Sequence, residues 1–166
     1  MASIDLIRNR RSVREYKDIP VSEEIIEEVL ECASLAPTAR NVQPWLIGAV
    51  TDRELLSELG AISDHGGFIA DCAVCFAVFC LADEKYRLED GCAATMNIIY
   101  ACEAHNIGTC WVAGDKKAYA EDVRSLLQVP GEYTLISLVP AGYPAGKVAA
   151  KKPKRTSEIS FRNLKK

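Results

Sequence analysis

The sequence predicts a single α+β domain in which helices and strands are mixed along the chain. Apolar residues recur at helical spacing in several segments, and short continuous apolar runs typical of buried strands separate these segments. The 166 residues suffice for one sizeable core, and no Gly/Ser-rich linker divides them. We therefore expect one domain over residues 1–146, followed by a basic tail over residues 147–166.

Five helices are expected, and each is indicated by the spacing of apolar residues, by a capping residue or by a residue that ends a helix. Ser3 can cap the first and Ser22 the second, which Pro37 stops. The predicted segments are 3 to about 10, 22 to the approach of Pro37, 52–60, 90–106 and about 117–128. Residues 90–106 are apolar on nearly every face, which predicts a central buried helix closed by Gly108.

Four apolar runs predict strands, at residues 45–50, 72–80, 109–114 and 133–142. The first two of these strands are expected to be buried. The glycine-rich phosphate-binding motif G-x-G-x-x-G does not follow the first of them. A dinucleotide-binding Rossmann domain is therefore not supported, and any nucleotide has to be held in another way.

Composition excludes several classes of protein. No apolar run reaches the roughly 20 residues that span a bilayer, and charges occupy the first residues where a signal peptide is apolar, so we expect a cytoplasmic protein that does not bind membranes. The acidic balance of −3 argues against a nucleic-acid partner. Cys72 and Cys75 have the C-x-x-C spacing of zinc ligands, but a second such pair is missing; we expect buried thiols and no metal.

Basic residues cluster just after the first predicted helix. The run Arg10-Arg11-Ser12-Val13-Arg14 carries three guanidinium groups and one hydroxyl, which together suit the oxygens of a terminal phosphate. Basic residues also end helices simply because they complement the helix dipole, so this run by itself leaves both interpretations open.

A compact polar turn, Pro37-Thr38-Ala39-Arg40-Asn41-Val42-Gln43, separates the second helix from the first strand. The amides of Asn41 and Gln43 donate and accept together, as a ring edge with alternating N–H and C=O groups requires. An asparagine turn followed by a tryptophan anchor for the strand is the alternative interpretation.

Taken together, these segments resemble the FMN-dependent nitroreductase-like family. That family begins with R-x-S-x-R, continues with an amphipathic helix, and then has A-P-S/T-x-x-N-x-Q-P-W. The resemblance continues through Asp90-Gly91 with Asn97, through Ile107 to Trp111, and through Gly142-Tyr143-Pro144. It implies a compact member of the nitroreductase fold, with a mixed, mostly antiparallel central sheet flanked by helices in an intertwined homodimer.

The resemblance also implies the residues that hold FMN. Arg10, Ser12 and Arg14 would bind it, with Arg11 beside them, and Arg14 would reach the N1/C2 edge of the ring, where a fixed cation stabilises the reduced flavin. Arg14 and Gly114 are thus the predicted catalytic positions. The backbone at Ala113 and Gly114 would contact N5, the atom that accepts hydride.

Other parts of the implied site come from the partner subunit, the Gly-rich loop and the tail. They are Pro37, Thr38, Ala39 and Asn41 across the dimer, Gln43 near the ring edge, His65 near the pyrimidine, and Lys154 and Arg155 at the phosphate. His65 is also compatible with an ordinary exposed loop residue.

The implied activity is a ping-pong reaction, in which NADH or NADPH reduces FMN and a small electron-poor acceptor then reoxidises it. The acceptor is a nitroaromatic compound, a quinone or a similar molecule. Only residues 81–89 fill the gap where many members carry extra helices, so the pocket should be shallow. Two alternatives stay open: a flavin or enone reductase, and an FMN-binding protein without efficient turnover.

Overall fold

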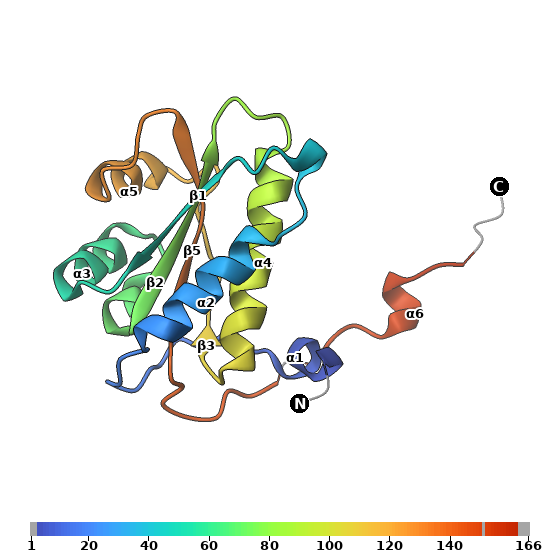
Figure 1. Ribbon diagram of the computed structural model, residues 1–166. Coiled ribbons are helices and arrows are strands. Elements are labelled where there is room, and N and C mark those ends of the chain that lie inside the picture. The colour runs from blue at the N-terminus through green and yellow to red at the C-terminus, as the bar shows by residue number, and fades with distance from the viewer. Residues whose placement is uncertain (1–2, 151, 163–166) are drawn as a thin grey trace.

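The computed structural model describes residues 3–150 and 152–162 and shows one antiparallel sheet with helices on both faces (Figure 1). The side chain of Ser3 and the tail residue Lys151 lie outside the described part, so the predicted Ser3 cap stays a prediction. Helices α2 and α4 cover one face, and α3 and α5 cover the other.

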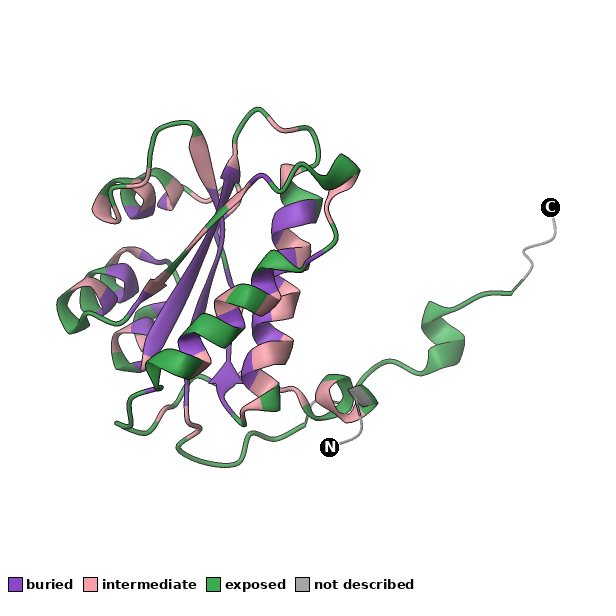
Figure 2. Ribbon diagram, viewed as in Figure 1, coloured by how far each residue is buried: buried purple, intermediate pink, exposed green. Residues whose placement is uncertain are grey.

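The sheet is built around two long buried strands. Its order is β1-β2-β5-β3, and β4 also pairs with β5 beyond β3. The strands are β1 Trp45–Val50, β2 Val74–Leu81, β3 Gly108–Thr109, β4 Val112–Ala113 and β5 Tyr133–Gly142. Figure 2 shows β2 and β5 buried along nearly their whole length, because both are interior strands covered on both faces.

Strand β1 is less buried than its apolar sequence predicts. It lies at one edge of the sheet, and alternate residues are exposed, with Leu46 39 % exposed. The apolar run marks the strand correctly, but an edge position leaves one of its faces half open.

The helices occupy the predicted segments with shifted ends. They are α1 Ser3–Asn9, α2 Glu23–Ser34, α3 Arg53–Ile62, α4 Arg87–Ala104, α5 Ala120–Leu126 and α6 Thr156–Ile159. The 3-10 turns η1 Ala39–Asn41 and η2 Gly67–Asp71 precede β1 and β2. The short helix α6 in the tail was not predicted. Within the described part of the chain, no helix is both long and apolar enough to cross a membrane.

Two glycines predicted to end helices have other roles. Gly60 lies inside α3, where a Cβ atom would approach the backbone oxygen of Gly67 to 3.1 Å, so its small size allows η2 to pack closely. Helix α4 ends before Asn106, which takes up the left-handed conformation at φ 59° that closes the helix. Gly108 instead begins β3 and packs against Val13.

The predicted strand 109–114 is interrupted in the middle. Strands β3 and β4 keep one register on β5, and between them Cys110 donates its N–H to the carbonyl of Pro140. Pro140 has no N–H to return, so this pair lacks the second hydrogen bond of an antiparallel ladder. The proline therefore divides one strand into two short pieces.

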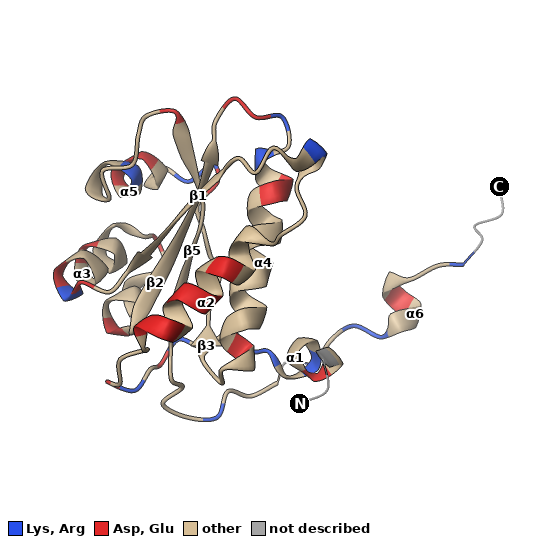
Figure 3. Cartoon of the chain, in the orientation of Figure 1, with Lys and Arg blue, Asp and Glu red and all other residues tan. Residues whose placement is uncertain are grey.

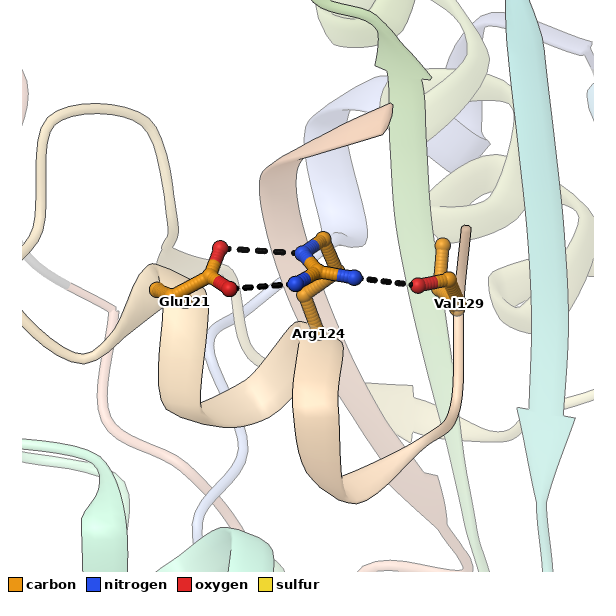
Figure 4. Close-up of polar contacts among 3 residues, drawn as sticks. All are labelled: Glu121, Arg124 and Val129. Carbon is orange, nitrogen blue, oxygen red and sulfur yellow. Dashed lines mark hydrogen bonds and ion pairs between the residues drawn. The ribbon is translucent and has the colours of Figure 1, made fainter. Parts of the chain in front are cut away.

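Helix α5 is anchored to the turn that leads into β5. The Arg124 guanidinium pairs with the Glu121 carboxylate and donates to the Val129 carbonyl oxygen at 2.6 Å (Figure 4). This contact fixes the end of α5 relative to the start of β5.

Candidate functional site

The basic segment Arg10–Arg14, which we call the arm, runs along the outer edge of the sheet. The N–H of Val13 donates to the carbonyl oxygen of Thr109 at 2.8 Å, and Ser12 forms a parallel bridge with Thr109. Val13 is buried while Arg14 is exposed, so the arm is held by its backbone and by one apolar side chain. The guanidinium groups of Arg10 and Arg14 remain available to a ligand.

A basic cavity of about 540 Å³ lies between the arm and the first part of the tail. It is lined by Ile7, Arg8, Arg10, Arg11, Ser12, Arg14, Val148, Ala149, Ala150 and Pro153. The guanidinium of Arg11 folds back onto the carbonyl oxygens of Arg8 and Arg10, both at 2.8 Å, so it closes α1 as well as adding charge. The remaining arginines can form the paired hydrogen bonds that a phosphate accepts.

The predicted tail residues Lys154 and Arg155 do not line this cavity. Arg155 instead caps α6 at the residue before its start, and its backbone N–H and its Nε both donate to Glu158. Figure 3 shows Lys and Arg spaced along the tail beyond the body of the molecule. Within this chain, the tail therefore contributes residues before Lys154 to the cavity.

Ala113 exposes backbone groups at the same sheet edge as the arm. Cys110 and Gly114 donate to Pro140 and Ile136 of β5, so the hydrogen bonds to β5 fall at alternate residues. Ala113 lies between such positions, and its N–H and C=O therefore face away from β5. The arm is bonded to that outer side at Thr109, and it runs parallel to the strand toward Ala113.

Gly114 has a structural reason for being glycine. Its N–H donates to the Ile136 carbonyl oxygen at 3.0 Å, and a Cβ atom would meet Leu135 Cγ at 2.5 Å. The N–H predicted to face a ligand is therefore already used inside the sheet. Of the two predicted backbone donors, Ala113 is the one left free to act outward.

The loop that contains His65 contacts both the arm and the turn that follows β4. The Arg14 guanidinium carbon lies 5.7 Å from the centroid of the Phe68 ring, and Asp64 pairs with Lys117 at 3.7 Å, just after Gly114. His65 lies between these contacts and is exposed. The structure thus brings the His65 loop to the arm and to the turn after β4.

The predicted turn 37–43 is held by a residue that sequence reasoning did not assign to the site. Asp90, only 5 % exposed, accepts hydrogen bonds from the Thr38 hydroxyl at 2.8 Å and from the Ala39 N–H at 3.1 Å. A buried acid at the start of an apolar helix could have signalled this role, because such a carboxylate requires donors.

This turn contains three non-glycine residues in the left-handed region: Arg40 at φ 55°, Asn41 at 56° and Gln43 at 52°. A non-glycine residue in this conformation costs free energy, and residues held in this way cluster at ligand-binding sites. The Gln43 amide donates to the Asn41 amide oxygen at 3.0 Å, and both side chains are exposed. The two amides therefore form one polar unit on the surface.

The arm and the turn lie at opposite ends of α4. Asp90 holds the turn at the start of this 18-residue helix, whereas Gly108, beyond its end, packs against the arm (Figure 1). A helix of this length spans about 27 Å. One chain therefore cannot bring its own arm and its own turn to the same small ligand.

Cys72, Cys75 and Cys110, of which Cys110 lies beside the arm, are buried thiols. Burial raises the pKa of Cys110, although Arg14, a hydrogen bond from Ser12 and Arg10 partly offset the effect. Burial also raises the pKa of Cys72 to about 12, and it raises the pKa of Cys75 well above the usual value of a thiol. Among the described residues, no group of three His, Cys, Asp or Glu side chains could hold a metal ion.

Comparison with known proteins assigns the fold and the motifs to one family. The model of the nitroreductase family matches residues 7–64 and 65–143. The chain belongs to the nitroreductase family. A protein of Archaeoglobus fulgidus, provisionally named NADH dehydrogenase/NAD(P)H nitroreductase, is 34 % identical over 149 residues, which are 85 % of this chain and 84 % of that protein.

Further relatives and structures agree with the nitroreductase assignment. The FMN reductase (NADPH) of Bacillus subtilis is 27 % identical and aligns with 96 % of this chain and 72 % of its own length. The FMN-dependent nitroreductase of Clostridium difficile has the same fold, with a TM-score of 0.90 at 24 % identity, covering 97 % and 99 % of the two chains. The predicted family and the predicted mixed, mostly antiparallel fold are confirmed.

Proposed function

We propose that this chain binds FMN and transfers hydride from NADH or NADPH to a small electron-poor acceptor, such as a nitroaromatic compound or a quinone. The observation that carries the proposal is the shared sheet edge, which joins a basic cavity at the arm to an outward N–H at Ala113. FMN has a phosphate at one end and a hydride-accepting ring at the other. The names of the relatives in Bacillus subtilis and Clostridium difficile support the same cofactor.

The arm suits the phosphate end of FMN. Arg10 and Arg14 present guanidinium forks, Ser12 adds a hydroxyl, and Arg11 adds positive charge to the cavity they line. Lys154 and Arg155 of a tail are proposed to approach this phosphate as well, and in this chain they lie outside its own cavity.

The rest of the edge suits the ring. Arg14, steadied over Phe68, places a cation where negative charge gathers on the N1/C2 side of a reduced flavin. Ala113 offers its N–H toward N5, and Gly114 fixes the strand end behind it. His65 borders the pyrimidine from its loop. When bound, FMN would supply the hydride chemistry through N5, and two half-reactions at this ring would alternate in a ping-pong sequence.

The second half of the site is proposed to come from another copy of the chain. Because α4 separates the arm from the turn, Pro37, Thr38, Ala39, Asn41 and Gln43 of the partner subunit would complete the site in a homodimer. The paired amides of Asn41 and Gln43 match a ring edge of alternating donors and acceptors.

A second candidate, an FMN-binding protein without efficient turnover, is favoured by one observation. Strand β2 ends at Leu81 and α4 begins at Arg87, so little chain is available to cover a substrate.

One experiment tests both candidates. The purified protein should be a yellow dimer with one FMN per chain, and anaerobic mixing with NADH or NADPH should bleach the oxidised flavin band. A colourless monomer that ignores added FMN contradicts the cofactor. A yellow protein that neither nucleotide bleaches supports the second candidate, and an acceptor panel with the bleaching protein then separates nitroaromatic, quinone, flavin and enone substrates.

A further inference from the structure

Tyr119 holds Ala113, the one exposed residue of β4, by its carbonyl group. Its hydroxyl donates to the carbonyl oxygen of Ala113, and its ring packs in the apolar cluster that also contains Val112 and Leu135. Only 5 % of Tyr119 is exposed, so the ring has little freedom to move. Burial and the nearby Asp64 both raise the pKa of this phenol, which keeps the hydroxyl protonated and able to donate.

The contact completes the fixation of two consecutive peptide units. The Ala113 carbonyl is held by Tyr119, and the following N–H, that of Gly114, donates to Ile136. The preceding residue, Val112, is paired with Leu138 of β5. Because the peptide groups on both sides of the Ala113 Cα are held, the Ala113 N–H points in one fixed direction, away from β5.

The turn after β4 lies between the two partners of this contact. Lys117 donates its N–H to the Gly114 carbonyl oxygen at 3.1 Å, with Lys116 in the left-handed region at φ 58° inside the turn. This conformation is costly for a lysine, so a fixed strand end is needed to maintain it. Tyr119 follows the turn directly and bonds back to the strand that precedes it.

We propose that Tyr119 is a positioning residue for hydride transfer, which aims the Ala113 N–H at the hydride-accepting atom of the flavin. The inference rests on the proposed function, because it requires a flavin ring at this sheet edge. Tyr119 acts through Ala113 and touches neither substrate nor cofactor. Displacing a reacting group by about 1 Å costs about a hundredfold in rate, so a modest loosening of one donor should cost about tenfold.

The test compares Tyr119→Phe with Tyr133→Phe. Both changes remove one phenol oxygen from a ring at the same apolar cluster, but the described residues show no side-chain hydrogen bond at Tyr133. With FMN labelled by nitrogen-15, Tyr119→Phe should shift the N5 resonance and slow anaerobic reduction by NADH or NADPH about tenfold, while FMN affinity changes less than about threefold. Tyr133→Phe should match the wild-type protein in all three measurements.

A second measurement uses the unaltered protein and so does not depend on how the variant folds. Adding FMN should shift the amide resonance of Ala113 more than that of Gly114, because only the former faces the ligand. A Tyr119→Phe protein with the wild-type N5 resonance and rate overturns the role of Tyr119 while the proposed function stands. An unshifted Ala113 amide overturns the contact of Ala113 with the ring, and the role of Tyr119 with it, while FMN binding and bleaching by NADH or NADPH test the proposed function separately. Failure of the wild-type protein to bind FMN instead overturns the proposed function, and this inference with it.

Discussion

The hydroxyl of Thr38 donates to the Asp90 carboxylate at 2.8 Å, and this contact joins the turn before β1 to the first part of α4. The same hydroxyl accepts the N–H of Gln43 at 3.1 Å, so one side chain connects both ends of the turn to the helix. Strained backbone persists only where its surroundings hold it, and Asp90 supplies that support for Arg40, Asn41 and Gln43.

Asp90→Asn should loosen this turn. An amide can accept one of the two hydrogen bonds but presents its NH₂ group to the other donor, so we expect a loss of about 1–3 kcal/mol in the free energy of unfolding. Urea denaturation measures this loss, and FMN titration should show weaker binding. Glu89→Gln, a neighbouring exposed change of the same chemistry, is the control. Equal stability of the two variants would show that Asp90 does not support the turn.

Arg14→Ala should weaken FMN binding and slow its reduction. The change removes a cation from the basic cavity and from its position over Phe68, and lost hydrogen bonds to a charged group correspond to about ten- to a hundredfold in affinity. Flavin fluorescence gives the affinity, and rapid mixing with NADH gives the rate. Lys17→Ala removes an exposed cation three residues further on and should change neither. Unchanged affinity and rate for Arg14→Ala would refute its assigned role.

Gly114→Ala should destabilise the fold through a steric clash. The new Cβ would lie 2.5 Å from Leu135 Cγ, in the interior of the sheet, and such overpacking costs about 1–3 kcal/mol. Gly131→Ala is the matched control, since a Cβ there meets no atom within 4 Å. Chemical denaturation compares the two. If both variants are equally stable, close packing does not explain the glycine at position 114.

Stability should fall with rising pH above about 9 because of buried thiols. Burial raises the pKa of Cys102 from 9.0 to about 12, so between these values the unfolded chain loses the proton first and is favoured. The Cys102 thiol contributes its full stabilisation below pH 9. Above pH 9, the free energy of unfolding falls by up to about 1.4 kcal/mol per pH unit. Urea denaturation of Cys102→Ala between about pH 8 and 10.5 should give a shallower dependence than the wild-type protein. Identical slopes would contradict this role for Cys102.

The sequence predicts the elements of this fold better than their ends. Helical spacing of apolar residues identifies α2, and nearly continuous apolar character identifies α4 and β5, because these signals lie in consecutive residues. The interruption between β3 and β4 depends on Pro140, which lies opposite Cys110 only after the strands have paired. Pairing partners are set by tertiary structure, so no local pattern could show this break.

The candidate site was predictable to a similar degree. The arm and the turn are contiguous runs of residues with recognisable chemistry, and both are visible in the printed sequence. Asp90 and Tyr119 act through contacts with residues elsewhere in the chain, and Gly114 has its N–H committed to β5. Such roles follow from three-dimensional neighbours, which is why sequence reasoning assigned the N5 contact to Ala113 and Gly114 together and could not choose between them.

The separation of the arm and the turn by α4 has a genetic consequence. If each site draws its arm from one chain and its turn from another, a subunit with a damaged arm and a subunit with a damaged turn can together form one intact site. Coexpressing Arg14→Ala and Asn41→Ala chains should therefore restore about half of the wild-type activity per mixed dimer, through complementation between two alleles that are each impaired alone.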